Sequence, residues 1–159
     1  MYSAVIVSLA ALAVGPVNRR CPIDGVIVNS SEALRSALAG TDVDIWISGV
    51  IDGDFEAQRS VALHGCENAV LNGTGKGTVL RLKGDDVVVE DFTLQRSGTR
   101  VSKEDGALKV SGKRAVVRRI AVRDTLYGIA LELCADCLLE DSTVDGRKGI
   151  EENQRGDGV

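Results

Sequence analysis

The chain has 159 residues, of which 44% are hydrophobic and 26% charged, and this length suits one domain that buries about two-thirds of its surface. Acidic and basic residues are interleaved and the net charge is −4, so nucleic acid is not an expected partner. Aromatic residues make up only 3%, which leaves few platforms for stacking on bases or sugars, whereas 18 glycines and 2 prolines favour a turn-rich β protein.

The amino terminus is apolar and resembles the hydrophobic region of a secretory signal. The run Ala4–Val14 is too short to span a bilayer, so no transmembrane segment is expected. Ala11-Leu12-Ala13 has the small-x-small pattern of a cleavage site, although no basic residue precedes it. We predict a leader over residues 1–20, a periplasmic or otherwise exported protein, and one domain over residues 21–159. The alternative is a buried first strand.

A short helix is predicted over residues 30–40. Ser30 or Ser31 suits the N-cap, and Gly40 suits the position after the last turn. Leu34 and Leu38 lie on one face, so this helix can cover the open end of a solenoid. Weaker strand-like segments follow at residues 45–50 and 61–71.

Three copies of one short unit then occupy residues 87–144. They begin at Val87, Ala115 and Cys137, which are offsets of 28 and 22 residues. Apolar residues recur at matching places in the columns Val87/Ala115/Cys137, Val89/Val117/Leu139 and Leu94/Val122/Val144. A repeat of about 22 residues rich in β-branched residues indicates a solenoid, in which each unit packs only against its neighbours.

A second set of strands precedes these units, at residues 77–82, 106–110 and 128–133. Their apolar and polar residues alternate, and a tight corner that contains glycine or aspartate follows. One coil is therefore expected to be a strand, a corner, a strand and a longer corner. The predicted fold is an all-β, right-handed parallel β-helix, a pectin-lyase-like solenoid with a short N-terminal capping helix.

Charged residues alternate in sign along the same repeat. The columns are Asp86/Arg114/Asp136, Glu90/Arg118/Glu140 and Asp91/Arg119/Asp141. Parallel strands lie about 4.8 Å apart, so opposite charges in adjacent coils would pair. We expect these columns to be exposed and to specify the register more than to add stability.

Insertions at the longer corner, residues 98–105 and 147–157, should project from one side of the solenoid. Insertions on one face of a repeat array are often its binding face, and the alternative is a solvated loop with no partner. The candidate partner-binding residues are Glu104, Asp105, Glu151, Asn153, Arg155 and Asp157.

Cys134 and Cys137 form a C-x-x-C pair. The repeat places Cys137 inward and Cys134 at an outward corner, so the pair would have to distort the coil to share a metal or a disulfide. A redox or metal role is therefore not expected. Cys21 and Cys66 would be able to pair in an exported protein, but the sequence leaves this open. His64 precedes Gly65 at an apparent corner and is interpreted as a turn residue.

No catalytic residues and no metal ligands are predicted. The repeat carboxylates alternate with arginines, and no spacing within the insertions requires a catalytic pair. A carbohydrate-active β-helix enzyme, such as a polysaccharide lyase, hydrolase or epimerase, remains the alternative function.

Several segments together resemble the NosD family, the periplasmic β-helix proteins of nitrous oxide reductase maturation. They are residues 61–65, 70–80, 85–98, 127–129 and the run Arg155-Gly156-Asp157-Gly158-Val159. The resemblance implies an exported, non-enzymatic accessory protein. Its partners would be ABC-type transporter subunits and the maturation components that assemble the copper site of nitrous oxide reductase. Copper is implied by the resemblance only, and no copper ligand carries over. Family chains are longer, so the sequence resembles an amino-terminal fragment with an incomplete solenoid.

Overall fold

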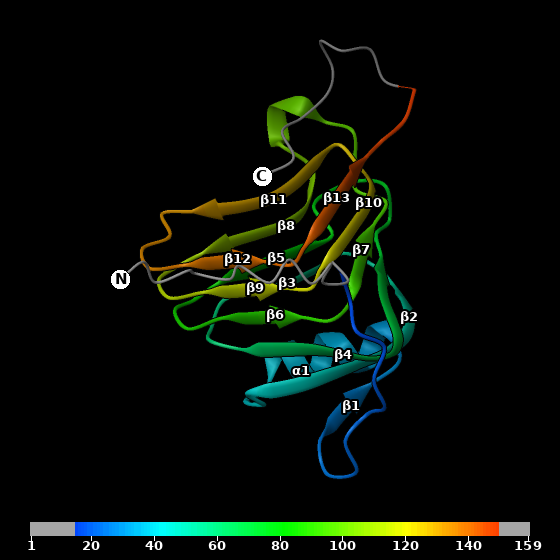
Figure 1. The fold of residues 1–159 in the computed structure, drawn as a ribbon, viewed down its shortest axis with the longest axis vertical. Coiled ribbons are helices and arrows are strands. Elements are labelled where there is room, and N and C mark those ends of the chain that lie inside the picture. Colours follow the sequence, from blue (N-terminus) through cyan, green and yellow to red (C-terminus); the bar gives the residue numbers. More distant parts are fainter. Residues whose placement is uncertain (1–14, 150–159) are drawn as a thin grey trace, which may run out of the picture.

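The structure is a computed structural model that describes residues 15–149, and its strands wind into a right-handed parallel β-helix (Figure 1). The elements are β1 (Val26–Val28), α1 (Ser31–Ala39), β2 (Asp44–Asp52), β3 (Phe55–Ala57), β4 (Ala62–Asn72), β5 (Leu80–Lys83), β6 (Val88–Glu90), β7 (Thr93–Gln95), the 3-10 helix η1 (Val101–Lys103), β8 (Gly106–Ser111), β9 (Val116–Arg118), β10 (Ala121–Thr125), β11 (Tyr127–Glu132), β12 (Leu138–Glu140) and β13 (Thr143–Gly146). The predicted fold class is confirmed.

Each later coil contains three strands, where the sequence pattern predicted two. The sets are β5–β6–β7, β8–β9–β10 and β11–β12–β13. The predicted unit over residues 87–94 is divided at Asp91, whose φ of 65° turns the chain, and Arg119 and Asp141 do the same with φ values of 51° and 48°. Aspartate is among the residues that adopt this left-handed conformation but arginine is not favoured there, so the Asp91/Arg119/Asp141 column did not predict a corner.

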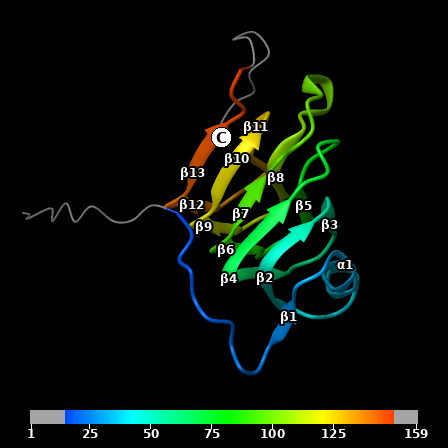
Figure 2. The same ribbon diagram turned by 90° about the vertical axis from the view of Figure 1, so that its right-hand side faces the viewer.

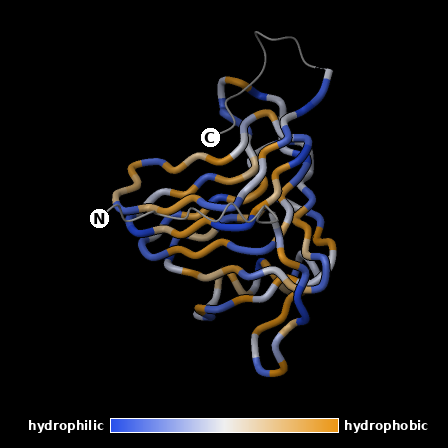
Figure 3. Tube along the Cα trace, in the orientation of Figure 1, coloured by the Kyte–Doolittle hydropathy of each residue, from blue (hydrophilic) through white to orange (hydrophobic). Residues whose placement is uncertain are grey.

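The predicted register is confirmed along the repeat. Val89 pairs with Val117, which pairs with Leu139, at the predicted offsets. On another face, Leu80 pairs with Leu108. Val89, Val117, Leu80 and Leu108 are fully buried, so matching apolar side chains stack along the axis of the solenoid. Figure 3 shows the resulting alternation of hydrophobic and hydrophilic residues along the strands.

Helix α1 caps the first coil, as predicted (Figure 2). Ser30 is the N-cap, and its hydroxyl accepts a hydrogen bond from the Ala33 amide at 3.2 Å. Leu34 and Leu38 are buried, and the helix packs against β1, β2 and β3. Its apolar face therefore covers core surface that would otherwise face water.

A segment before β1 runs along the solenoid axis and crosses several coils (Figure 2). We call residues 15–21 the strap. The Gly15 amide donates to the Asp141 carbonyl at 2.9 Å, the Val17 amide donates to the Asp91 carboxylate at 3.1 Å, and Cys21 is disulfide-bonded to Cys66. Residues 15–20 of the predicted leader thus contact the domain, whereas residues 1–14 lie outside the described part of the chain.

The charge columns pair as predicted between the first two repeat units. Within the described residues, no ion pair joins their arginines to the third-unit carboxylates Asp136, Glu140 and Asp141. Two of the paired carboxylates are not exposed. Glu90 and Asp91 have only 5% and 3% of their surfaces exposed. The guanidinium of Arg118 lies 2.5 Å from the Glu90 carboxylate, and Arg119 lies 2.6 Å from Asp91. Arg19 of the strap also pairs with Asp91. The strap covers this corner, so the prediction of solvent-exposed pairs was wrong there.

Arg118→Glu should lower the free energy of unfolding by about 1–3 kcal/mol, because it removes one of the two guanidinium partners of the buried Glu90 and places a second negative charge beside it. Urea denaturation would measure the change. The matched control is Arg20→Glu, an exposed residue whose reversal should stay within about 0.5 kcal/mol of wild type. Equal stability of both variants would contradict the register.

Candidate functional site

The bases of the two predicted insertions meet at one corner of the solenoid. Ser97, which precedes the first insertion, is fully buried, and its hydroxyl accepts a hydrogen bond from the Leu126 amide at 2.9 Å. Arg147, which begins the second insertion, donates to the Ser97 carbonyl at 2.8 Å and to the Asp124 carboxylate at 2.9 Å. These bonds join three successive coils, so both insertions leave the same side, as predicted.

Asp105 holds the first insertion closed. Its carboxylate accepts hydrogen bonds from the Arg100 amide at 3.0 Å and from two guanidinium nitrogens of Arg100 at 3.0 and 3.1 Å. Burial alone would raise the pKa of the Asp105 carboxyl, but the bonds and charge of Arg100 outweigh it and hold this pKa below its usual value. Asp105 therefore remains ionised and clamps the loop.

Gly98 allows this clamp to form. A Cβ atom at Gly98 would lie 2.2 Å from an Asp105 carboxylate oxygen and 2.7 Å from the Lys76 carbonyl carbon. Any side chain at Gly98 would therefore displace Asp105 or the neighbouring coil.

The loop presents a mixed surface above this clamp. Val101 is 49% exposed, and Lys103 and Glu104 are also exposed. The Glu104 carboxylate lies 3.0 Å from the Lys109 ammonium group, which orients it along the outer face of β8. Of the predicted partner-binding residues, Glu104 faces solvent, whereas Asp105 has only 1% of its surface exposed. Glu151, Asn153, Arg155 and Asp157 lie outside the described residues.

An arginine-lined cleft of about 330 Å³ adjoins the loop. We call it the arginine cleft, and its lining includes Arg35, Asp54, Phe55, Glu56, Arg81 and Arg100. The Arg35 guanidinium lies over the Phe55 ring, 4.9 Å from its centroid. Arg100 is already paired with Asp105. The two remaining guanidinium groups equal the two lining carboxylates in number, so the cleft has no excess positive charge.

Sequence reasoning missed the arginine cleft because its arginines come from α1, β5 and the insertion loop. The sequence contains one sign of this cleft, the polar position of Arg81 in the alternating pattern of β5. That pattern indicates that the Arg81 side chain points outward, but it does not indicate which residues lie beside it.

His64 is not a turn residue, contrary to the prediction. It lies within β4, where its Nδ1 is 2.7 Å from Glu90 and its Nε2 is 3.2 Å from Asp44. Its ring also stacks on Trp46 with centroids 4.6 Å apart. His64 thus extends the Glu90/Arg118 column by one coil, because β4 pairs with β6 in that register.

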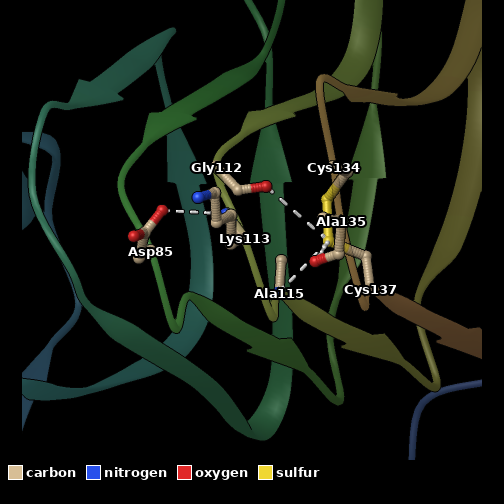
Figure 4. Close-up of a disulfide and its surroundings, with 7 residues drawn as sticks. All are labelled: Asp85, Gly112, Lys113, Ala115, Cys134, Ala135 and Cys137. Carbon is tan, nitrogen blue, oxygen red and sulfur yellow. Dashed lines mark hydrogen bonds between the residues drawn. A yellow bond between two sulfur atoms is a disulfide. The ribbon is translucent and has the colours of Figure 1, made fainter.

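All four cysteines are bonded. Cys21 is bonded to Cys66, the pairing that the sequence left open, and Cys134 is bonded to Cys137 (Figure 4). The second bond forms even though a shared disulfide was not expected, and the expected distortion is confined to the corner, since Leu138 keeps its register with Val116. Leu133 absorbs the turn by adopting a φ of 50°, which the repeat pattern did not reveal.

Within residues 15–149, no group of three or more histidine, cysteine, aspartate or glutamate side chains is placed to hold a metal ion. In the same described part of the chain, no helix is both long and apolar enough to cross a membrane.

Comparison with known proteins confirms the resemblance to the NosD family. A protein of Pseudomonas aeruginosa described as a probable ABC transporter binding protein NosD is 27% identical over 154 residues, which cover 95% of this chain and 34% of that protein. A protein of Stutzerimonas stutzeri with the same description is 25% identical over 114 residues, which cover 70% of this chain and 26% of that protein. The chain therefore spans about a third of the length of these relatives or less. No family model and no solved structure matches it.

Proposed function

We propose that this protein is an exported, non-enzymatic accessory protein that binds an ABC-type transporter and assists copper-site maturation of nitrous oxide reductase. The similarity to two proteins described as ABC transporter binding proteins supports the transporter as partner. The observation that carries the proposal is the insertion corner, where a rigid base presents a charged loop. Binding residues are commonly placed on loops that a rigid scaffold positions.

The contact would be formed by the exposed part of the first insertion. Val101 supplies an apolar centre, and Lys103 and Glu104 supply charges of both signs beside it. Such a patch matches the usual anatomy of a protein interface, in which a polar rim surrounds an apolar contact. Glu151, Asn153, Arg155 and Asp157 remain predicted contacts on the second insertion, and Asp105 serves to hold the loop.

Copper enters this proposal as cargo of the pathway. The described residues do not fit a copper site, because His64 is held by two carboxylates and all four cysteines form disulfides. The proposed role is therefore to hold protein partners together, and no step of it passes through a metal held by residues 15–149.

Reversing the loop charges tests the contact. The double variant Lys103→Glu/Glu104→Lys should bind detergent-solubilised transporter roughly tenfold more weakly, which corresponds to about 1.4 kcal/mol. Its circular dichroism should match wild type, because both side chains are exposed. The control is Lys83→Glu, which changes an exposed charge in β5, a strand outside this loop. Unchanged capture by the double variant, or an equal loss in the control, would count against the proposal.

The alternative, a carbohydrate-active enzyme, would use the arginine cleft, where the guanidinium groups of Arg35 and Arg81 would contact the carboxylates of a uronate polymer. Incubating the purified protein with such polymers distinguishes the two functions. Release of shortened or unsaturated sugars would replace the accessory role by a catalytic one.

A further inference from the structure

The Cys134–Cys137 disulfide closes the corner between β11 and β12 in the last described coil (Figure 4). The two Cα atoms are 5.8 Å apart, and the cysteines are separated by only three positions in sequence. Both cysteines are half-buried, whereas Leu133, Ala135 and Asp136 around them are exposed. The disulfide thus lies in a turn that a partner can approach.

The corner does not require this disulfide. Equivalent corners in the two preceding coils have none, yet they stack through backbone hydrogen bonds from Gly84 to Ser111 at 2.9 Å and from Asp86 to Lys113 at 2.8 Å. The Arg114 amide donates to the Ala135 carbonyl at 2.8 Å, so the last corner retains one of these two bonds. A disulfide across so short a loop also removes less entropy from the unfolded chain than Cys21–Cys66 does. Stability alone is therefore a weak reason for its presence.

The two sulfurs lie in different surroundings. The Ala115 amide points at Cys137 Sγ from the preceding coil, with the nitrogen 3.3 Å from the sulfur. Cys137 follows Val87 and Ala115 in the inward column, whereas Cys134 lies in the turn next to Leu133, which is 95% exposed. The Gly112 and Ala135 carbonyl oxygens lie farther from Cys137 Sγ, at 3.8 and 3.7 Å. The closer N–H group stabilises a thiolate, so Cys137 is the better leaving group and Cys134 the sulfur that is attacked.

We propose that Cys134 and Cys137 form a thiol–disulfide exchange site whose substrate is the dithiol or disulfide of a partner protein. This inference does not depend on the proposed function. Exposed Leu133 would contact apolar residues beside the partner's cysteine.

The reaction balances as a two-electron exchange. A partner thiolate attacks Cys134 Sγ and forms a mixed disulfide, while the Cys134–Cys137 bond breaks and its electron pair leaves on Cys137, where the Ala115 amide stabilises it. The partner's second thiolate then attacks the partner's first sulfur, which is bonded to Cys134 in the mixed disulfide, and Cys134 leaves as a thiolate. The partner becomes a disulfide, this chain becomes a dithiol, and water supplies the two protons. The reverse sequence reduces the partner.

The test uses the whole chain, with Cys21–Cys66 as the internal control. Oxidised protein is mixed with a reduced thioredoxin-fold C-x-x-C protein, quenched in acid and alkylated, and each disulfide is followed by peptide mass spectrometry. Cys134–Cys137 should be reduced at least about tenfold faster than Cys21–Cys66, with unchanged circular dichroism. Equal rates, faster reduction of Cys21–Cys66 or loss of β structure on reduction would overturn the inference.

Two variants, each mixed with the thioredoxin-fold protein in its disulfide form and quenched in acid, locate the exchanging sulfur. The Cys134 thiolate of Cys137→Ser should attack the partner disulfide and be trapped as a mixed disulfide, because Cys137 is no longer there to resolve it. Cys134→Ser should trap much less on Cys137 beneath the corner. The opposite preference would overturn the assigned roles. The wild-type kinetics test the site itself without any substitution, so a variant that fails to fold leaves that conclusion testable.

Discussion

Asp91→Ala should lower the free energy of unfolding by roughly 3–5 kcal/mol, the usual cost of removing one partner from a buried ion pair. Asp91 is 3% exposed and accepts hydrogen bonds from Arg119 at 2.6 and 2.9 Å, from the Val17 amide at 3.1 Å and from Arg19. Its loss leaves Arg119 without this partner and removes two anchors of the strap. Urea denaturation would give the stability, and limited trypsin digestion after Arg19 or Arg20 would report release of the strap.

The control is Asp86→Ala, which removes an exposed carboxylate from the other charged corner of the same coil. This change should leave the denaturation midpoint near wild type, because solvent replaces the lost partner. Similar losses in the two variants would mean that the strap does not depend on Asp91.

Acid titration examines the same contact. Burial would raise the pKa of Asp91, but Arg119, the Val17 amide and Arg19 outweigh it and hold that pKa below 3.8. A carboxyl whose pKa is lowered by folding stabilises the fold above its unfolded value. That contribution is lost as the pH falls through the folded value. Wild type should therefore lose stability below about pH 4 more steeply than Asp91→Ala.

Removing the Cys21–Cys66 disulfide with Cys21→Ala/Cys66→Ala should cost about 4 kcal/mol, since it releases a closed loop whose ends are 45 positions apart. The matched control, Cys134→Ala/Cys137→Ala, opens a loop with a separation of 3 and should cost about 2 kcal/mol. Urea denaturation of the oxidised proteins would measure both. Equal costs would show that neither disulfide acts mainly through loop closure.

The repeat itself was predictable because a parallel β-helix places equivalent residues at the same position around each coil, so that they stack along the axis. The columns through Val89 and Val117 and through Leu94 and Val122 were identified from spacing alone, and both are buried in the predicted register. The opposite charges of Glu90 and Arg118 supported the same offset, and the two side chains form an ion pair in the structure.

The corner at Asp91 could not be predicted by those rules. Its positive φ recurs at Arg119 and Asp141, and arginine does not indicate a corner. The contacts of Asp91 with Arg119 and with Val17, which lies 74 positions away in sequence, cannot be deduced from the repeat. Because such distant contacts cannot be deduced from the repeat, the strap was not identified. Without the strap, the charge columns were expected to lie at the surface.

The candidate site was predictable only in part. The extra length between repeats revealed the insertion loop, and Glu104 faces solvent there. Asp105 differs from Glu104 because its carboxylate turns inward and binds Arg100. The direction of this side chain depends on the conformation of the loop, which the order of residues does not reveal. The arginine cleft likewise exists only when residues 35, 81 and 100 are brought together by winding of the chain.

By itself, the sequence determined the solenoid, its offset, its inward columns and its capping helix, because these depend on periodic burial between neighbouring coils. Tertiary structure alone decided the three-strand coil, the strap across Asp91, the inward turn of Asp105 and both disulfides. Each of these depends on contacts between residues that do not share the repeat, or on backbone angles that residue type does not specify.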